Sequence, residues 1–253
     1  MTMTPACRAA LLGLLTTACT PFALSPPSRT LPLESPATLR EGRVALQAAA
    51  GSTFGDTETA AVRARAGLTP DIEVQLEGSY VHYEYGDERG PDIGAGRVGV
   101  KVAPTPHLAF ALGLGAGSHT HGAFVAPDAG LLAGYENPDI VLWGAARLAL
   151  SVPAYPRTVV VTHEVSDRVE RVSLTPYETL VTQLSTGVRI PIPIAAPPVE
   201  SVSLLGGVAW THLHGIAIDR DIWFLHGEIG LEIVLDTHPI EDPNRLLFEE
   251  RDE

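Results

Sequence analysis

The chain has 253 residues and a formal net charge of −13, which argues against nucleic acid as a partner because phosphate binding needs a basic face. It contains 24 Gly and 21 Pro, and 45% of its residues are hydrophobic while only 6% are aromatic. This composition suits one large all-β domain or two smaller domains.

The first residues have the features of an export signal. Arg8 precedes an apolar run over 9–15 that is too short to span a bilayer as a helix. Leu15-Thr-Thr-Ala-Cys19 resembles a bacterial lipoprotein signal, in which the cysteine becomes the acylated first residue, although the leucine lies four residues before Cys19 rather than three. We therefore expect a signal peptide over 1–18 and lipidation at Cys19. Ordinary cleavage near Ala18 or Ala23 is the alternative.

The segment 19–41 is rich in Pro and Ser, which predicts an extended linker between the anchor and the first strand. From there to residue 235 the chain alternates polar and apolar residues in ten segments. Their expected bounds are 42–50, 58–68, 71–85, 93–103, 107–118, 125–136, 139–152, 178–190, 200–212 and 222–235. Strands of this length, tilted by about 40°, rise by roughly 25 Å, the height of the apolar band of a membrane barrel.

The connections between these segments alternate in kind. Tight, Pro-bearing turns lie at 68–71, 103–107, 136–139 and 190–198. Longer loops lie at 51–58, 86–92, 117–123, 153–177 and 213–221. Short turns on one side and long loops on the other are typical of an up-and-down transmembrane β-barrel. The sequence thus predicts an all-β, antiparallel barrel over 42–235.

Each segment has one apolar and one polar face. The apolar face is clear in Leu108, Phe110, Leu112 and Leu114. The opposite face carries seven basic and four acidic side chains, which we expect to form a charge network in the lumen: Arg43, Arg63, Arg65, Glu73, Glu77, Arg97, Lys101, Arg147, Arg189, Glu228 and Glu232.

Alternation alone does not decide which face meets water, because a soluble lipocalin-like barrel that binds an apolar ligand has its apolar face inside. Two observations favour lipid outside. The segment 107–118 offers only small residues over the middle of its second face, Ala109, Ala111, Gly113 and Gly115, which suits a crowded lumen better than a solvated surface. Four aromatic residues also lie on the apolar face near segment ends, where interfacial girdles form: Tyr80, Tyr135, Trp210 and Trp223.

The stretch 43–235 resembles the small bacterial outer-membrane β-barrel proteins. The resemblance implies the outer membrane of a Gram-negative bacterium and contact with its lipid. With an even number of strands, we expect both termini to be periplasmic and 236–253 to be an acidic periplasmic tail. Such barrels commonly end on an aromatic residue in the last strand, and this chain departs from that pattern.

We expect the long loop 153–177 to lie outside the cell, where it folds back as a hairpin and is the first candidate to contact an extracellular partner. About eight strands enclose a space that side chains just fill, so a charged ten-strand lumen is expected to be closed or nearly closed by ion pairs. The expected role is structural, surface-interacting or that of a narrow pore, with anion preference following from the basic excess.

No cofactor is expected. His119 with His121 and His212 with His214 have the spacing that puts two rings on one face of a strand, but no cysteine or obvious carboxylate completes a metal site. An outer-membrane hydrolase with a rim active site is the rival from another class. Its candidate residues are Asp87, Ser118, His119, His121, Asp219 and Asp221. No motif places them together, so we expect no enzyme.

Overall fold

The computed structural model describes residues 24–29, 33–53, 57–85, 88–89, 92–119, 122–156, 159–165, 168–174, 176–192, 194, 197–218 and 221–237. Ten strands form the barrel: β1 (Arg43–Thr53), β2 (Thr57–Thr69), β3 (Ile72–Tyr85), β5 (Ile93–Thr105), β6 (Leu108–His119), β7 (Gly122–Glu136), β8 (Val141–Pro156), β11 (Thr179–Ile192), β12 (Val199–Gly215) and β13 (Asp221–Asp236). All the regular elements of the described residues are β-strands, which confirms the predicted all-β class. In the described part of the chain, no helix has the length and apolar character needed to cross a membrane.

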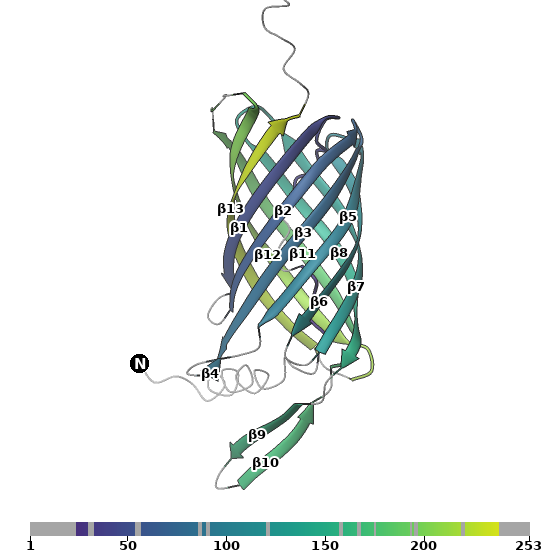
Figure 1. The fold of residues 1–253 in the computed structure, drawn as a ribbon, viewed down its shortest axis with the longest axis vertical. Helices are drawn as coiled ribbons and strands as arrows, with labels where there is room; N and C mark the ends of the chain where they lie inside the picture. Colours follow the sequence, from purple (N-terminus) through teal and green to yellow (C-terminus); the bar gives the residue numbers. More distant parts are fainter. Residues whose placement is uncertain are drawn as a thin grey trace, which may run out of the picture.

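The barrel is closed because β1 pairs with both β2 and β13 (Figure 1). Every pairing in it is antiparallel and joins strands that follow one another around the wall, which is the up-and-down topology that the alternation predicts. Each predicted segment corresponds to one observed barrel strand, and the observed strands extend further into the loops, most of all around 141–156 and 199–215. Closure leaves no free sheet edge.

The two ends of the barrel differ, and we name them by their connections. The turn mouth carries the connections that follow β2, β5, β7 and β11, each of two to six residues. The loop mouth carries the connections that follow β1, β3, β6, β8 and β12, and the longest of them joins β8 to β11. The short strand β4 (Glu88–Arg89) pairs with β3 there. The longer loops expected at 51–58 and 117–123 are instead short, because the flanking strands extend to 53, 57, 119 and 122.

The long connection at the loop mouth contains the predicted hairpin. Its strands are β9 (Val159–Val165) and β10 (Arg168–Leu174), which pair as a separate two-stranded sheet. The hairpin stands beyond the barrel wall in Figure 1.

The apolar face of the strands points outward and the charged face points into the lumen. Leu112 is 65% exposed and Ile229 is 70% exposed, whereas Glu73 and Lys101 are fully buried. This arrangement is the reverse of a lipocalin-like barrel, so that alternative is not favoured. The four aromatic residues expected at the interfaces also face outward.

The described part of the segment expected to be an extended linker between the anchor and the first strand is instead buried inside the barrel. Residues 24–29 and 33–40, which we call the arm, are buried except at 37–38 and 40, and Leu24, Ser25, Leu33 and Glu34 are almost fully enclosed. The expectation was wrong because composition reports only how a segment behaves in water. Here the barrel wall supplies partners for both its apolar and its charged side chains.

Candidate functional site: the plugged lumen

The arm runs along the whole lumen. At the loop mouth, Leu24 forms a bridge with Tyr177, and the backbone N–H of Ser25 donates to Thr179 Oγ1 at 2.8 Å. At the turn mouth, the Thr38 hydroxyl donates to the carbonyl oxygen of Pro70 at 2.6 Å. The chain then turns into β1 through Gly42, whose φ of +72° is a conformation that glycine adopts without strain.

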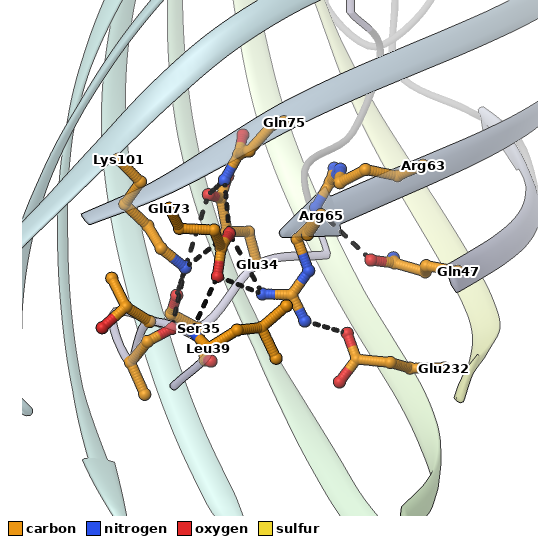
Figure 2. A network of polar contacts seen from close by, with 12 residues as sticks. Glu34, Ser35, Leu39, Gln47, Arg63, Arg65, Glu73, Gln75, Lys101 and Glu232 are labelled. Carbon is orange, nitrogen blue, oxygen red and sulfur yellow. Dashed lines mark hydrogen bonds and ion pairs between the residues drawn. The ribbon is translucent and has the colours of Figure 1, made fainter. Parts of the chain in front are cut away.

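Glu34 holds the arm in the middle of the barrel. Its carboxylate accepts hydrogen bonds from Arg147 Nη2 at 2.5 Å, from Arg29 Nη1 at 3.2 Å and from the amide of Gln75. Lys101 Nζ lies 3.8 Å away. Figure 2 shows Glu34 surrounded by wall side chains. One arm carboxylate therefore connects side chains of β3, β5 and β8.

The wall also binds the backbone of the arm. Lys101 Nζ donates to the carbonyl oxygens of Ser35 at 3.2 Å and Ala37 at 2.8 Å. Glu73 accepts from the N–H of Leu39 at 3.0 Å and pairs with Lys101 at 3.3 Å (Figure 2). These contacts fix where the backbone of the arm lies along the barrel and hold it against the wall.

Arg29 ties the arm to the wall nearer the loop mouth. Its Nε donates to Glu77 Oε1 at 2.8 Å, and Arg63 Nε donates to the other oxygen of Glu77 at 2.9 Å. Arg65 pairs with Glu73 at 3.2 Å and with Glu232, so the network reaches across the β1–β13 seam. A carboxylate between two guanidinium groups is well compensated in a buried site.

Small residues on β6 make room for these groups. A Cβ atom on Gly113 would lie 2.3 Å from Arg97 Nη2, and one on Gly115 would lie 2.2 Å from Ser28 Cβ of the arm. Arg97 in turn holds Asp128 with two hydrogen bonds, at 2.6 Å and 2.7 Å. The glycines of 113–117 therefore serve lumen packing.

Apolar contacts complete the plug. Leu33 packs against Trp143, Leu205 and Ala209, and Leu24 packs against Val181 and Leu213 at the loop mouth. Beside the arm lies a cavity of about 20 Å³ lined by residues including Ser28, Arg29, Asp128, Arg147 and Gln183. That space suits about one water molecule, so it is no passage for a nutrient.

Eight of the eleven predicted lumen residues lie in the buried network or against it: Arg63, Arg65, Glu73, Glu77, Arg97, Lys101, Arg147 and Glu232. Arg189 extends the network to the turn mouth, where it pairs with Glu232 at 3.4 Å and Glu136 at 2.7 Å. Arg43 stands apart from it, paired with Glu200 at 2.6 Å on the rim. Glu228 is buried with His226 and Thr59 instead of an arginine.

Sequence reasoning missed three charged members, Arg29, Glu34 and Asp128. The polar face of the predicted strands has seven basic but only four acidic side chains. This excess indicated that further carboxylates lie in the lumen, because a closed lumen cannot leave several cations unpaired. Asp128 lies on the expected face of its strand. Arg29 and Glu34 lie in the segment predicted to be an extended linker, so no pattern connected them with the barrel.

The rim histidines form two small clusters. His212 and His214 both contact Asp221 Oδ1, at 3.0 Å and 2.8 Å, on the outward face beside Trp210. His82 contacts Asp92 at 2.6 Å. Within the described ranges, no group of three or more His, Cys, Asp or Glu side chains is arranged to hold a metal ion. His121 lies outside the described residues.

The hydrolase candidates are not brought together where they are described. Ser118 and His119 are successive residues of β6 and point to opposite faces of the wall. Asp221 lies on β13 with its two histidines. Asp87 and Asp219, like Cys19, lie outside the described residues.

No family model matches the chain, and no curated protein matches its sequence. Among solved structures, it is similar to the N-terminal β-barrel domain of Pseudomonas aeruginosa OprF, with 12% identity over 78% of this chain and 100% of that chain and a TM-score of 0.33. The β domain of the Bordetella autotransporter BrkA has 13% identity over 75% and 97% and a TM-score of 0.39. Neisserial surface protein A has 12% identity over 77% and 94% and a TM-score of 0.29. The likeness concerns the barrel fold and extends to no functional detail.

Proposed function

We propose that the protein is an outer-membrane barrel that is closed in its resting state by its own arm and acts as a rigid membrane anchor for the surface loops. The apolar outward face and the aromatic residues near both mouths support a place in lipid. The buried contacts of Glu34 with Gln75, Lys101 and Arg147 carry the proposal, because they join the arm to three strands of the wall. A narrow-pore role would require the arm to leave.

The conductance of the purified protein in planar lipid bilayers tests this proposal. We expect the full chain to show no steady open level. A variant that lacks residues 20–40 is expected to conduct, because the ten-strand wall alone does not fill its lumen. Removal of residues 238–253 is the matched control and should leave the bilayer silent. Steady conductance of the unaltered chain would refute closure by the arm.

The hairpin of β9 and β10 supports a surface-interaction role within the same proposal. It projects from the loop mouth, which is the extracellular side if the short turns are periplasmic. Deletion of residues 157–175 should then abolish binding of an extracellular partner to whole cells without changing the yield of folded barrel.

Lipidation at Cys19 remains a proposal from the sequence. Labelled fatty acid is expected to enter the natural protein and to be absent from Cys19→Ser. Equal labelling of the two proteins would refute acylation at this residue.

A further inference from the structure

The direction of the arm decides where the N-terminal end of the chain leaves the barrel. Ser25 is the best-defined point, because its hydroxyl lies 2.8 Å from the hydroxyl of Ser151 and its N–H bonds Thr179. Ser151 lies in the last third of β8, and Thr179 is the first residue of β11. Both flank the β9–β10 hairpin, so Ser25 lies at the loop mouth.

The other end of the arm lies at the turn mouth. Leu39 bonds Glu73 near the start of β3, and Glu41 forms a bridge with Gly67 near the end of β2. The last barrel strand ends at the same mouth, since Asp236 is paired with Arg43. The described N-terminal and C-terminal ends therefore lie at opposite mouths, whereas the even strand count led us to expect both termini on one side.

An even strand count does not by itself fix the mouth at which the arm begins. Ten strands do return the chain to the side on which β1 begins, as the pairing of Arg43 with Asp236 shows. The arm, however, crosses the barrel once more before β1, inside the lumen. Leu24 packs at the loop mouth against Val181 and Leu213, and the arm occupies the lumen between there and the turn mouth. We therefore expect the polypeptide that precedes Leu24 to leave the barrel by the loop mouth.

We infer that the barrel carries its own N-terminal end across the membrane and presents it on the side where the β9–β10 hairpin stands. The inference rests on the proposed outer-membrane location, in which that side is the cell surface. It gives the barrel a second task, the surface display of the residues that precede the arm. Cys19 lies five residues before Leu24, a reach of at most about 17 Å, so an acyl group on it would belong to the outer leaflet.

Epitope accessibility tests this inference in cells. One short tag is inserted between Ala23 and Leu24, where it survives either expected cleavage; a second is placed between Ser166 and Asp167, and a third after Glu253. We expect antibody to reach the first two tags on intact cells and the third only after permeabilisation. Protection of the first tag together with the third, while the second is exposed, would overturn the inference.

Disulfide cross-linking of the folded protein tests the direction of the arm without the use of cells. In a full chain with Cys7→Ser and Cys19→Ser, the pair Ser25→Cys with Ser151→Cys should form a disulfide on mild oxidation of the folded barrel. The pair Ser25→Cys with Ser203→Cys is the matched control, because Ser203 faces the lumen near the turn mouth. Cross-linking of the control pair alone would show that the arm runs in the opposite direction and would refute the inference. Closure of the lumen by the arm, which is the proposed function, is tested separately by the conductance of the unaltered protein.

Discussion

At the scale of single residues, the environment of a side chain follows from its parity along the strand. Leu112 and Ala111 are neighbours on β6, yet Leu112 is 65% exposed on the outer face and Ala111 is buried against Ala109 and Leu132. The sequence alternation separates these two faces, because successive side chains of a strand point in opposite directions, and the barrel places the face of Leu112 outside.

Leu112→Arg should destabilise the barrel by about 2–4 kcal/mol, because a lipid-facing charge near the bilayer midplane is poorly solvated. Leu68→Arg is the matched control: Leu68 is also exposed but lies at the end of β2, where the cost is about 0–1 kcal/mol. The measurement is the free energy of unfolding by urea in liposomes. Equal, small losses at both positions would show that the outer face does not meet lipid.

Glu34→Ala should cost about 3–5 kcal/mol of the same free energy, because Arg147 and Lys101 would stay buried without this carboxylate. Glu200→Ala is the control, since its pair with Arg43 is partly exposed at the rim and is worth about 0–1 kcal/mol. A loss at Glu34 no greater than that at Glu200 would mean that the arm is not bound by ion pairs.

At the scale of elements, the strands were predictable and the arm was not. Ten alternating segments and nine connections fixed each strand to within a few residues, and the hairpin over 159–174 also matched its expected place. The arm shows no period because it pairs with the wall through isolated polar contacts, without a ladder of backbone hydrogen bonds. The Pro and Ser content therefore predicted an extended linker for a segment whose described residues lie inside the barrel.

Glycines of β6 offer a test of the arm as an element. Gly115→Val should displace the arm, because its first side-chain carbon would already meet Ser28 at 2.2 Å. Gly94→Val on the adjacent strand β5 is the control, since nothing lies within 4 Å of its Cβ position. We expect open-channel events from the first variant and none from the second. Two silent variants would mean that the arm yields without leaving the lumen.

At the scale of the whole molecule, the lumen is close to neutral. Eight Arg and Lys side chains form ion pairs in the described residues, and their partners are seven carboxylates: Glu34, Glu73, Glu77, Asp128, Glu136, Glu200 and Glu232. Glu228 is a further carboxylate in the lumen, paired with His226. The basic excess on which an anion-preferring pore was expected therefore disappears.

A closed barrel of this kind should resist detergent as a unit. We expect the unheated protein to migrate on a cold SDS gel as a compact folded band that shifts after boiling, and to fractionate with membranes. Recovery in the soluble periplasmic fraction, without a shift of the band after boiling, would contradict a barrel that is embedded in a membrane.

The sequence by itself determined the period-two alternation, the connections and hence the all-β barrel, because these depend on neighbours along the chain. It favoured an apolar outside, and the exposed side chains of the folded barrel decided that point. Only the tertiary structure decided that residues 24–29 and 33–40 lie in the lumen, because the contact that holds them joins Glu34 to Arg147, 113 positions away, and leaves no local trace. The direction of the arm was likewise decided there, by Ser25 at one mouth and Leu39 at the other. An even strand count fixes where β1 begins and β13 ends, but it does not fix the path of a segment that the closed wall surrounds.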